Sequence, residues 1–433
     1  MHSRIFTVVL SLLLFTAPFA EAGRIVPLDE AGWPQFRGPM RDGVSAETGL
    51  LQSWPEGGPQ ELWRFEKLGK GYASPIVTEA GIFVAGDVDA DTVIHAFTLD
   101  GTLKWQTKNG TAWTEPWGGS RAACTYSESR VYHMNGHGRT VCLDAETGKE
   151  LWAVETLERF GGETIEWGIS ECVLVDGDVV YVTPGGEQAY MAALDKRTGE
   201  TVWASPPLEF ERTYEFGGKA VEPSAMDHDN TGYASPILLE IDGRRVLVRT
   251  SAQHLVFVDA ADGALLWKLP VYARFEVLGA IPVYWNDHVY FSAPDQFGGG
   301  MFSMENSPEG FRVAQVWKTD FDNCHASMVA VDGRIYGSGY RTRREWVALD
   351  AVTGKELYTS SDLQQGVCAY ADGRLYALAQ DGQVALLKPT DTAFETMGSF
   401  RIAEKRKDVW AHPAICDGRL YLHRYFDYER RLA

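Results

Sequence analysis

The chain has 433 residues, with 40 Lys and Arg against 59 Asp and Glu, which gives a formal net charge of −19. Such an acidic chain repels phosphate backbones and anionic lipid surfaces, so we expect no nucleic-acid partner. Hydrophobic residues make up 45% and charged residues 23% of the sequence, which is typical of a well-buried globular protein and excludes a largely disordered one.

The first 22 residues have the features of an export signal. Residues 1–4 include Arg4, residues 5–19 are mostly apolar, and Ala20-Glu21-Ala22 places small residues where a signal peptidase cleaves. The apolar run is too short and too weakly flanked for a transmembrane helix. We therefore predict a signal peptide over residues 1–22, export to the periplasm or the extracellular space, and no transmembrane span.

The next segment, residues 23–58, is too short and too rich in Gly and Pro to form a core of its own. We predict that it packs across the rim of a single domain formed by residues 59–433.

Along this domain one pattern recurs: an acidic residue, two variable residues, Thr-Gly or Asp-Gly, three more residues and an aromatic. It occurs at Leu143–Trp152, Leu194–Trp203, Val258–Trp267 and Leu349–Tyr358, with a shortened copy at Leu99–Trp105. Each copy predicts a strand, a tight turn at the glycine and a second strand that ends in the aromatic.

The aromatics that end these units recur about every 40–50 residues, which is the period of a four-stranded propeller blade. Each large ring is expected to wedge between neighbouring blades as a structural docking residue. The eight docking residues are Trp63, Trp105, Trp152, Trp203, Trp267, Trp317, Tyr358 and Phe400.

The two ends of the repeat array are each incomplete. The last repeat, from about Trp410, has no closing aromatic, whereas Trp63 has no blade before it. We predict that residues 60–65 form the strand that completes the C-terminal blade, because closure removes exposed sheet edges. The expected fold is an all-β, eight-bladed β-propeller of four-stranded antiparallel blades, closed by the strand near Trp63.

The repeat resembles the tryptophan-docking motif of quinoprotein dehydrogenases. Ala193–Trp203 matches that motif in full, and Cys142–Trp152 and Ala348–Tyr358 each depart from it at one position. The same repeat is known from the outer-membrane assembly lipoprotein family, whose propellers are not catalytic. Trp33–Pro39, followed by Arg41-Asp-Gly-Val, is similar to the start of exported bacterial propellers of the pyrroloquinoline-quinone-like (PQQ-like) type. The resemblance implies a PQQ-like propeller over nearly the whole mature chain.

The resemblance also implies that residues just before each inner strand line the mouth of an axial funnel. Glu166 with Asn323 could ligate calcium there, and Trp167 or Trp410 could stack on a planar ring. In the alternative interpretation the aromatics plug the funnel and Arg121 pairs with Glu166. The candidate ligand-binding residues are Tyr72, Trp113, Trp117, Arg121, Glu166, Trp167, Tyr233, Asn323, His325, Trp410 and His412.

A quinone dehydrogenase needs a calcium ion, a catalytic carboxylate and a flat slot for the cofactor. Family enzymes cover that slot with a disulfide between adjacent cysteines, whereas the six cysteines here are scattered singly. We interpret them as small buried hydrophobic residues, although an exported chain could still form one bridge. We therefore expect no cofactor, assign no catalytic residue, and leave the question of a metal open.

These features favour an exported, monomeric, non-catalytic module that binds a protein or glycan partner through its rim or funnel. One alternative is a dehydrogenase that depends on PQQ and calcium and oxidises alcohols or sugars. A second is a glycan-binding module, because Trp and Tyr rings stack on sugar rings.

Overall fold

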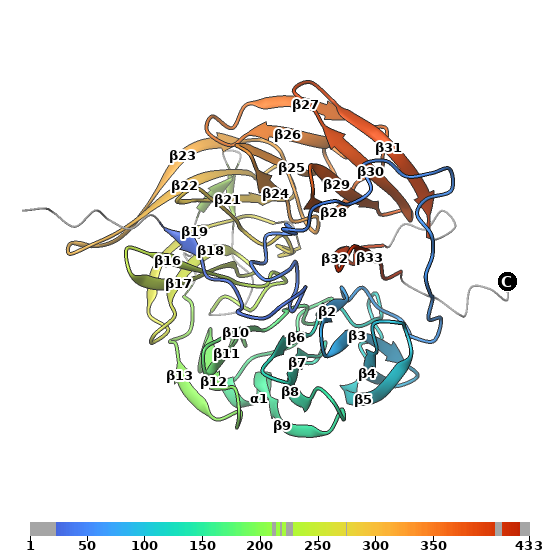
Figure 1. The fold of residues 1–433 in the computed structure, drawn as a ribbon. Coiled ribbons are helices and arrows are strands. Elements are labelled where there is room, and N and C mark those ends of the chain that lie inside the picture. Colours follow the sequence, from blue (N-terminus) through green and yellow to red (C-terminus); the bar gives the residue numbers. More distant parts are fainter. Residues whose placement is uncertain are drawn as a thin grey trace, which may run out of the picture.

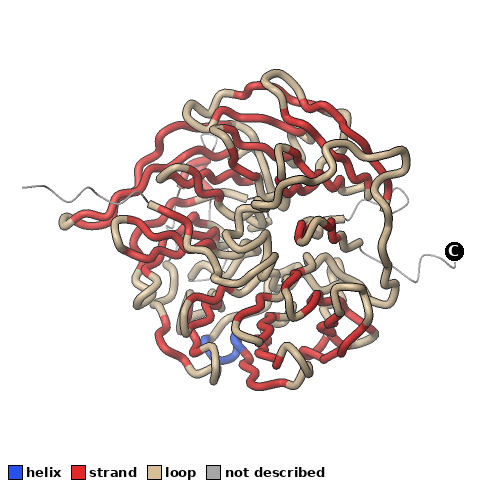
Figure 2. The backbone as a smooth tube through the Cα atoms, viewed as in Figure 1, coloured by secondary structure: helices blue, strands red, loops and turns tan. Residues whose placement is uncertain are grey.

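A computed structural model describes residues 23–209, 228–273, 275–402 and 409–424, together with the backbone of residues 214–216 and 219–221. The strands form small antiparallel sheets arranged around one axis, like the blades of a propeller (Figure 1). The predicted signal peptide lies outside the described residues. Within them the fold is nearly all-β, with one short helix, α1 (Thr156–Phe160), after blade 2 (Figure 2).

Blades 1 to 3 are four-stranded sheets whose strands pair in chain order. Blade 1 consists of β2 (Ile76–Thr78), β3 (Gly81–Val88), β4 (Asp91–Phe97) and β5 (Leu103–Thr111). Blade 2 consists of β6 (Thr125–Ser127), β7 (Arg130–Met134), β8 (Arg139–Asp144) and β9 (Glu150–Glu155). Blade 3 consists of β10 (Leu174–Asp176), β11 (Val179–Val182), β12 (Ala192–Asp195) and β13 (Thr201–Ala204).

Blade 4 has a fifth strand, because the N-terminal β1 (Arg24–Ile25) adds to its inner edge. Its other strands are β16 (Ile237–Ile241), β17 (Arg244–Thr250), β18 (His254–Asp259) and β19 (Leu265–Pro270). The connection from blade 3 carries a two-stranded hairpin of β14 (Tyr214–Phe216) and β15 (Lys219–Val221).

Blades 5 to 7 are again four-stranded, and blade 8 has two strands among the described residues. Blade 5 consists of β20 (Val283–Trp285), β21 (His288–Ala293), β22 (Gly298–Ser307) and β23 (Gly310–Thr319), and blade 6 of β24 (Val329–Val331), β25 (Arg334–Ser338), β26 (Trp346–Asp350) and β27 (Glu356–Ser360). Blade 7 consists of β28 (Gly366–Ala371), β29 (Arg374–Ala379), β30 (Gln383–Pro389) and β31 (Phe394–Arg401). The described strands of blade 8 are β32 (Ala414–Cys416) and β33 (Arg419–Tyr421).

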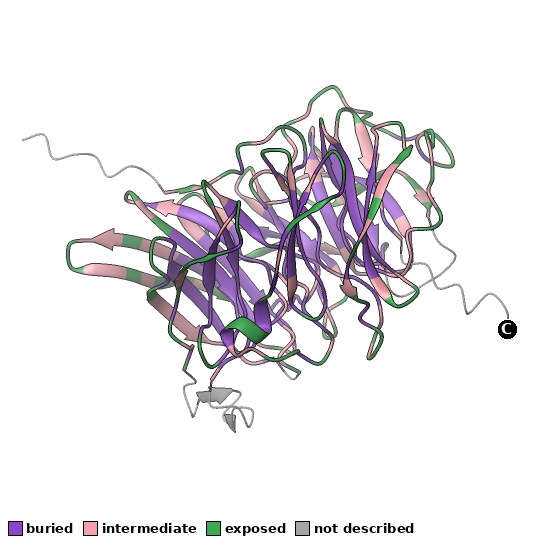
Figure 3. Ribbon diagram, turned by 90° about the horizontal axis from the view of Figure 1, so that it is seen from below, coloured by how far each residue is buried: buried purple, intermediate pink, exposed green. Residues whose placement is uncertain are grey.

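The hydrophobic core lies between the blades, around their inner strands. In blade 1, seven of the eight residues of β3 are buried, whereas most residues of the outer strand β5 are exposed or half-buried. Figure 3 shows the same distribution around the ring, with buried inner strands and exposed outer edges. Because a blade buries both faces against its neighbours, its inner strands are mostly apolar.

The predicted turn chemistry is visible in blade 2. The Asp144 carboxylate accepts hydrogen bonds from the backbone N–H of Thr147 at 2.9 Å and from its hydroxyl at 2.6 Å. Gly148 follows with a φ of +71°, a conformation that favours glycine. The Asp-x-x-Thr-Gly pattern is therefore a turn that connects the third and fourth strands of a blade.

In each of these turns the glycine also contacts the docking aromatic of the preceding blade. A Cβ added to Gly199 would lie 2.8 Å from Cε3 of Trp152, so a side chain there would displace the indole. The indole N–H of Trp152 donates to the backbone oxygen of Lys196 in the next blade at 3.0 Å. Equivalent hydrogen bonds from Trp105, Trp203 and Trp317 reach the carbonyls of the next blade at 3.0–3.1 Å.

The ring closes through blade 8, since β32 contacts both β28 of blade 7 and β2 of blade 1. Trp63 lies at this seam as predicted: its ring centroid is 6.4 Å from that of Tyr421 on β33, and it covers Gly101 of blade 1. The eight-bladed propeller is thus confirmed. The expected strand at residues 60–65, however, is not formed. The reason is that the described part of blade 8 has no third strand with which this segment could pair.

The N-terminal segment crosses the face of the ring at which the inner strands end (Figure 1). After β1 it bridges to blade 1 through Trp33 and Val77, and to blade 7 through Val44 and Tyr370. Among the described residues, no helix is long and apolar enough to cross a lipid bilayer. All six cysteines are unpaired, and five of them are buried.

Candidate binding site in the axial funnel

The floor of the funnel is formed by two arginines from the N-terminal segment. Arg37 is 1% exposed, and its guanidinium donates to the backbone oxygens of Ser327 at 3.0 Å and Met328 at 2.6 Å. It also lies 3.1 Å from Nδ1 of His412. Ser327 and Met328 immediately precede the inner strand of blade 6, and His412 lies two residues before that of blade 8. Arg37 therefore ties two blades together on the axis.

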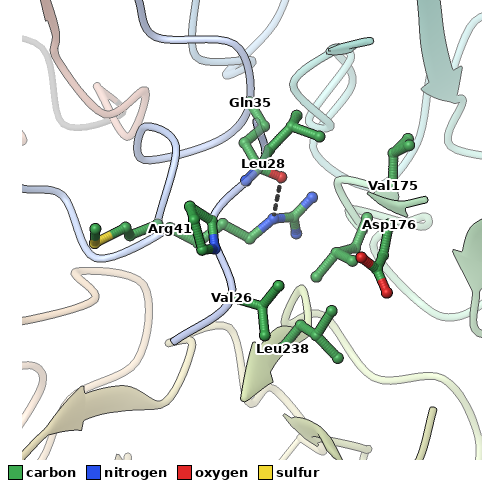
Figure 4. Close-up of a pocket in the computed structure, with 10 residues that line it drawn as sticks. Val26, Leu28, Gln35, Arg41, Val175, Asp176 and Leu238 are labelled. Atoms are coloured by element: carbon green, nitrogen blue, oxygen red, sulfur yellow. Dashed lines mark hydrogen bonds between the residues drawn. The ribbon is translucent and has the colours of Figure 1, made fainter. Parts of the chain in front are cut away.

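Arg41 ties blades 3 and 4 together in the same way. It is 2% exposed and donates to the backbone oxygens of Cys172 at 2.9 Å, Val173 at 2.5 Å and Pro236 at 3.1 Å. Gln35 accepts a fourth hydrogen bond at 2.8 Å, drawn as a dashed line in Figure 4. The space left beside the guanidinium is about 10 Å³, so the side chain fills its site.

Burial lowers the pKa of Arg37 and of Arg41 to about 10. Both guanidinium groups therefore remain charged at neutral pH, and backbone carbonyl dipoles provide most of their hydrogen-bond acceptors. An arginine suits this position because its planar fork of donors reaches several carbonyls at once.

Above this floor, aromatic side chains stack across the mouth. Tyr72 and Trp410 have ring centroids 4.8 Å apart, and Trp410 stacks on His325 at 5.0 Å with an interplanar angle of 4°. His325 meets Tyr340 edge-on at 5.2 Å, and the Arg121 guanidinium lies 5.5 Å from the centroid of Tyr72. These residues come from blades 1, 2, 6 and 8.

A second group lines the rest of the mouth. Arg341 lies over both Tyr340 and Phe275, at 5.4 and 5.2 Å from their centroids. Phe275 meets Trp167 edge-on at 6.1 Å, and Trp167 is 6.1 Å from Tyr233. Contacts between side chains thus run around the mouth from Arg121 to Tyr233.

Six of the eleven predicted funnel residues come together in these two groups, and five lie outside them. His412 lies lower, at the level of Arg37, and Trp113 is buried against His137. Trp117 is exposed beside the mouth, where its backbone oxygen accepts a hydrogen bond from the Arg121 guanidinium. Glu166 is exposed as well, and Asn323 is buried with its amide donating to the backbone oxygen of Ser338. The pairing of Arg121 with Glu166 remains a prediction.

Three mouth residues, Phe275, Tyr340 and Arg341, were not predicted. Tyr340 and Arg341 follow β25, in the loop between the second and third strands of blade 6, whereas the predicted funnel residues all lie before inner strands. The Tyr-Arg-Thr-Arg-Arg run at 340–344 directly after a strand is the signal that could have identified them.

The residues present do not fit a calcium–quinone centre. Glu166 is exposed whereas Asn323 is buried, and the described residues contain no group of three or more His, Cys, Asp or Glu that could hold a metal ion. Trp410, one of the predicted stacking platforms, already stacks on Tyr72 and His325. We therefore derive no reaction step through a quinone.

A buried Asp–His–Ser cluster in blade 4 contains the residue types of a hydrolase, but not their arrangement. Asp229 accepts hydrogen bonds from Nδ1 of His254 at 2.7 Å and from the Ser251 hydroxyl. Because the hydroxyl is directed to the carboxylate and not to the imidazole, the serine–histidine contact of a hydrolase triad is missing. All three side chains are at most 2% exposed. The cluster is structural, and it holds the loop that carries Tyr233.

The position of His325 predicts an acid dependence of stability. Burial lowers its pKa to about 4, and the positive charges of Arg121 and Arg341 act in the same direction. In the unfolded chain the imidazole takes up a proton near pH 6.5, whereas in the folded chain it stays neutral until about pH 4. The free energy of unfolding therefore decreases as the pH falls from about 6.5 towards 4. We expect His325→Gln to reduce the loss of unfolding free energy between pH 7 and pH 5 by about 1–2 kcal/mol, measured by urea unfolding. An unchanged difference would contradict this assignment.

Comparison with known proteins places the chain in a family. A family model described as outer membrane protein assembly factor BamB matches residues 90–337, which is more than half of the chain. The chain belongs to this family. The BamB protein of Moranella endobia (strain PCIT) is 23% identical over 271 residues, or 60% of this chain. The match spans 62% of that relative, which is less than two thirds of its length.

Two solved structures show how widely this fold is shared. BamB from Moraxella catarrhalis aligns with a TM-score of 0.52 at 16% identity, over 81% of this chain and 90% of that one. Quinohemoprotein alcohol dehydrogenase from Comamonas testosteroni aligns with a TM-score of 0.59 at 15% identity, over 90% and 76%. The predicted PQQ-like propeller is confirmed. Because one fold hosts an assembly factor and an oxidoreductase, it does not decide the function.

Proposed function

We propose that this chain is an exported, non-catalytic binding or scaffold module, and that a protein partner docks on the mouth of its funnel. The observation that carries the proposal is that the chain's own side chains fill the axis. Arg37 and Arg41 form the floor, and the rings of Tyr72, Trp410 and His325 stack above it. A small substrate on the axis would have to displace these side chains, whereas large side chains beside the mouth are exposed.

That surface has the composition of a protein interface. Trp117 and Phe275 are 57% and 42% exposed, which is unusual for such large apolar side chains. Arg341 lies beside Phe275, and aromatic residues with arginine are the side chains enriched at interfaces and among their energetic hot spots. The family description, an assembly factor for outer membrane proteins, supports a protein partner over a small molecule.

The test is affinity capture from cell envelopes of the source organism, with recovered proteins quantified by mass spectrometry. The double variant Trp117→Ser/Phe275→Ser should lose a partner at least about 10-fold, which corresponds to about 1.4 kcal/mol. The matched control Val202→Ser/Val316→Ser replaces residues of similar exposure, 56% and 50%, on outer strands, and should retain it. Equal recovery by both variants would contradict the proposal.

The same protein tests the alternatives. Purified chain incubated with PQQ and calcium should not reduce a dye at the expense of alcohols or sugars. Dye reduction would replace the proposal by the dehydrogenase alternative. Binding to a glycan array that disappears in the Trp117→Ser/Phe275→Ser variant would instead support the glycan-binding alternative.

A further inference from the structure

Gly23, the first residue after the predicted export signal, lies beside three oxygen atoms of blades 4 and 5. A Cβ added to Gly23 would be 3.0 Å from Oδ1 of Asp287, 3.5 Å from the backbone oxygen of Glu240 and 3.5 Å from the hydroxyl oxygen of Tyr284. Apart from the residues next to it in the chain, these oxygens are the nearest described heavy atoms to that position. One side of Gly23 is therefore lined by hydrogen-bond acceptors, which suit a donor and not an apolar side chain.

The carboxylate in this group departs from the repeat. The turns between the first and second strands of blades 4, 6, 7 and 8 have glycine at their second position, with φ of 66–76° (Gly243, Gly333, Gly373 and Gly418). Blade 5 has Asp287 at the equivalent position, with a φ of 65°. A residue with a side chain is less stable than glycine in this left-handed conformation. Blade 5 thus places a carboxylate beside Gly23 against a backbone preference.

Hydrogen bonds hold Gly23 next to the three oxygens. The Tyr284 hydroxyl donates to the backbone oxygen of Gly23 and accepts from the backbone N–H of Asp287 at 3.1 Å. The hydroxyl oxygen also lies 3.2 Å from Oδ1 of Asp287. The Glu240 carboxylate binds the guanidinium of Arg24 at 3.0 Å, and β1 pairs with β16 through the same two residues. Because the carbonyl of Gly23 and the whole of Arg24 are fixed, the nitrogen of Gly23 stays near the three oxygens.

Removal of the export signal changes the chemistry of this nitrogen. In the uncleaved chain the nitrogen belongs to the Ala22–Gly23 peptide bond and carries one hydrogen. When a signal peptidase hydrolyses that bond, the C–N bond breaks, the hydroxyl group of a water molecule joins the Ala22 carbonyl carbon, and the water's other proton goes to the nitrogen. At neutral pH the new Ala22 carboxyl group loses its proton and the Gly23 amine gains one, since their pKa values are about 3.5 and about 7.8. Gly23 then carries an ammonium group with three donors.

An ammonium group fits the position described above for an added Cβ. Once no residue precedes Gly23, rotation about its Cα–C bond can carry the nitrogen to that position, and a C–N bond is about as long as a C–C bond. There the nitrogen lies within hydrogen-bond distance of the Asp287 carboxylate, and a shift of about 0.3 Å brings the other two oxygens within range. The contact with Asp287 joins opposite charges and is therefore the strongest of the three.

We propose that the oxygens of Asp287, Glu240 and Tyr284 bind the α-ammonium group that removal of the export signal creates on Gly23, and that this contact fastens β1 to blade 4. The proposal rests on the predicted cleavage after Ala22 and does not depend on what the funnel mouth binds. Since β1 begins the segment that carries Arg37 and Arg41 to the axis, the processed chain holds this segment more firmly than the unprocessed chain does.

Hydrogen exchange tests the contact in two full mature chains that begin at Gly23, one with a free amine and one with an acetylated amine. The reporter is the backbone amide of Val26, which donates to the backbone oxygen of Leu238 at 2.8 Å and is exposed to exchange when β1 detaches. At about pH 6.5, where the amine is charged, this amide should exchange about 3–10-fold more slowly in the free-amine chain. Equal exchange in the two chains would overturn the proposal.

Asp287→Gly separates the ammonium contact from a merely structural role. The variant has the residue that the other blades use, so its urea unfolding should show no loss of global stability. Exchange of the Val26 amide should nevertheless become about 3–10-fold faster in the free-amine chain and stay unchanged in the acetylated chain. Asp332→Asn, which removes an exposed carboxylate from the equivalent turn of blade 6, should change neither chain.

Two further results would contradict the assignment. If Asp287→Gly altered the exchange of both chains equally, the carboxylate would act on β1 without the ammonium group. If mass spectrometry of the exported protein placed its first residue at a position other than 23, no ammonium group would form at this site.

Discussion

Replacing Arg41 by methionine should lower the free energy of unfolding by about 3–5 kcal/mol, although Arg41 lies in a loop. The substitution removes the donors that satisfy the buried carbonyls of Cys172, Val173 and Pro236, at the entrances of two inner strands. Buried acceptors without a donor are unfavourable, and methionine is long enough to fill the space but cannot donate. Urea unfolding of the two proteins measures the difference.

Arg197→Met is the control for the loss of positive charge, because the Arg197 side chain is 58% exposed in the turn of blade 3. It should change the unfolding free energy by less than about 0.5 kcal/mol. Arg41→Lys should recover part of the lost stability, since an ammonium group has donors but lacks the planar fork. Equal stability of Arg41→Met and Arg197→Met would show that Arg41 does not hold blades 3 and 4 together.

Trp203→Ala should destabilise the protein by about 3–5 kcal/mol through a cavity between blades 3 and 4. The Trp203 ring lies over Gly263, where an added Cβ would be 2.7 Å from it, and its N–H donates to the backbone oxygen of Ala260 at 3.1 Å. The substitution removes both contacts, and neither blade can move to fill the gap without breaking its other contacts around the ring. Thermal and urea unfolding report the loss.

The neighbouring Val202 provides the matched control, because it is on the same strand, β13, but is 56% exposed on the outer edge. Val202→Ala should cost less than about 1 kcal/mol. If the two substitutions had the same effect, the tryptophan would not be the residue that docks blade 3 on blade 4.

The sequence was sufficient to predict the propeller because its repeats are local. The turn at Asp144–Gly148 and the ring of Trp152 lie within one stretch of chain, and their spacing directly specifies a strand, a turn and a second strand. Ring closure through Trp63 was also predictable, since one end of the repeat array supplies what the other lacks. The strand expected at residues 60–65 was wrong because strand formation depends on a partner strand, which the spacing of aromatics does not reveal.

The funnel could be predicted in part. Residues before inner strands do gather at the mouth, and Tyr72, His325 and Trp410 stack there. Arg37 and Arg41 were recognised solely as part of a resemblance. The carbonyls that tie them to the blades lie more than 100 residues away in the chain. Because every residue has a backbone carbonyl, the sequence does not indicate which ones an arginine will contact. Two arginines four residues apart in a Gly- and Pro-rich loop are the signal that could have raised the question.

The segment that contains Trp63 completes the ring beside blade 8. A photo-reactive amino acid such as benzoylphenylalanine at position 63, followed by proteolysis and mass spectrometry, tests it directly. The structure predicts cross-links from position 63 to peptides that contain Tyr421 and Phe97, whose rings lie 6.4 and 6.3 Å from that of Trp63. The same group at Val352, on the outside of blade 6, should give neither. Cross-links from position 63 that reach other blades and miss both peptides would contradict the closed ring.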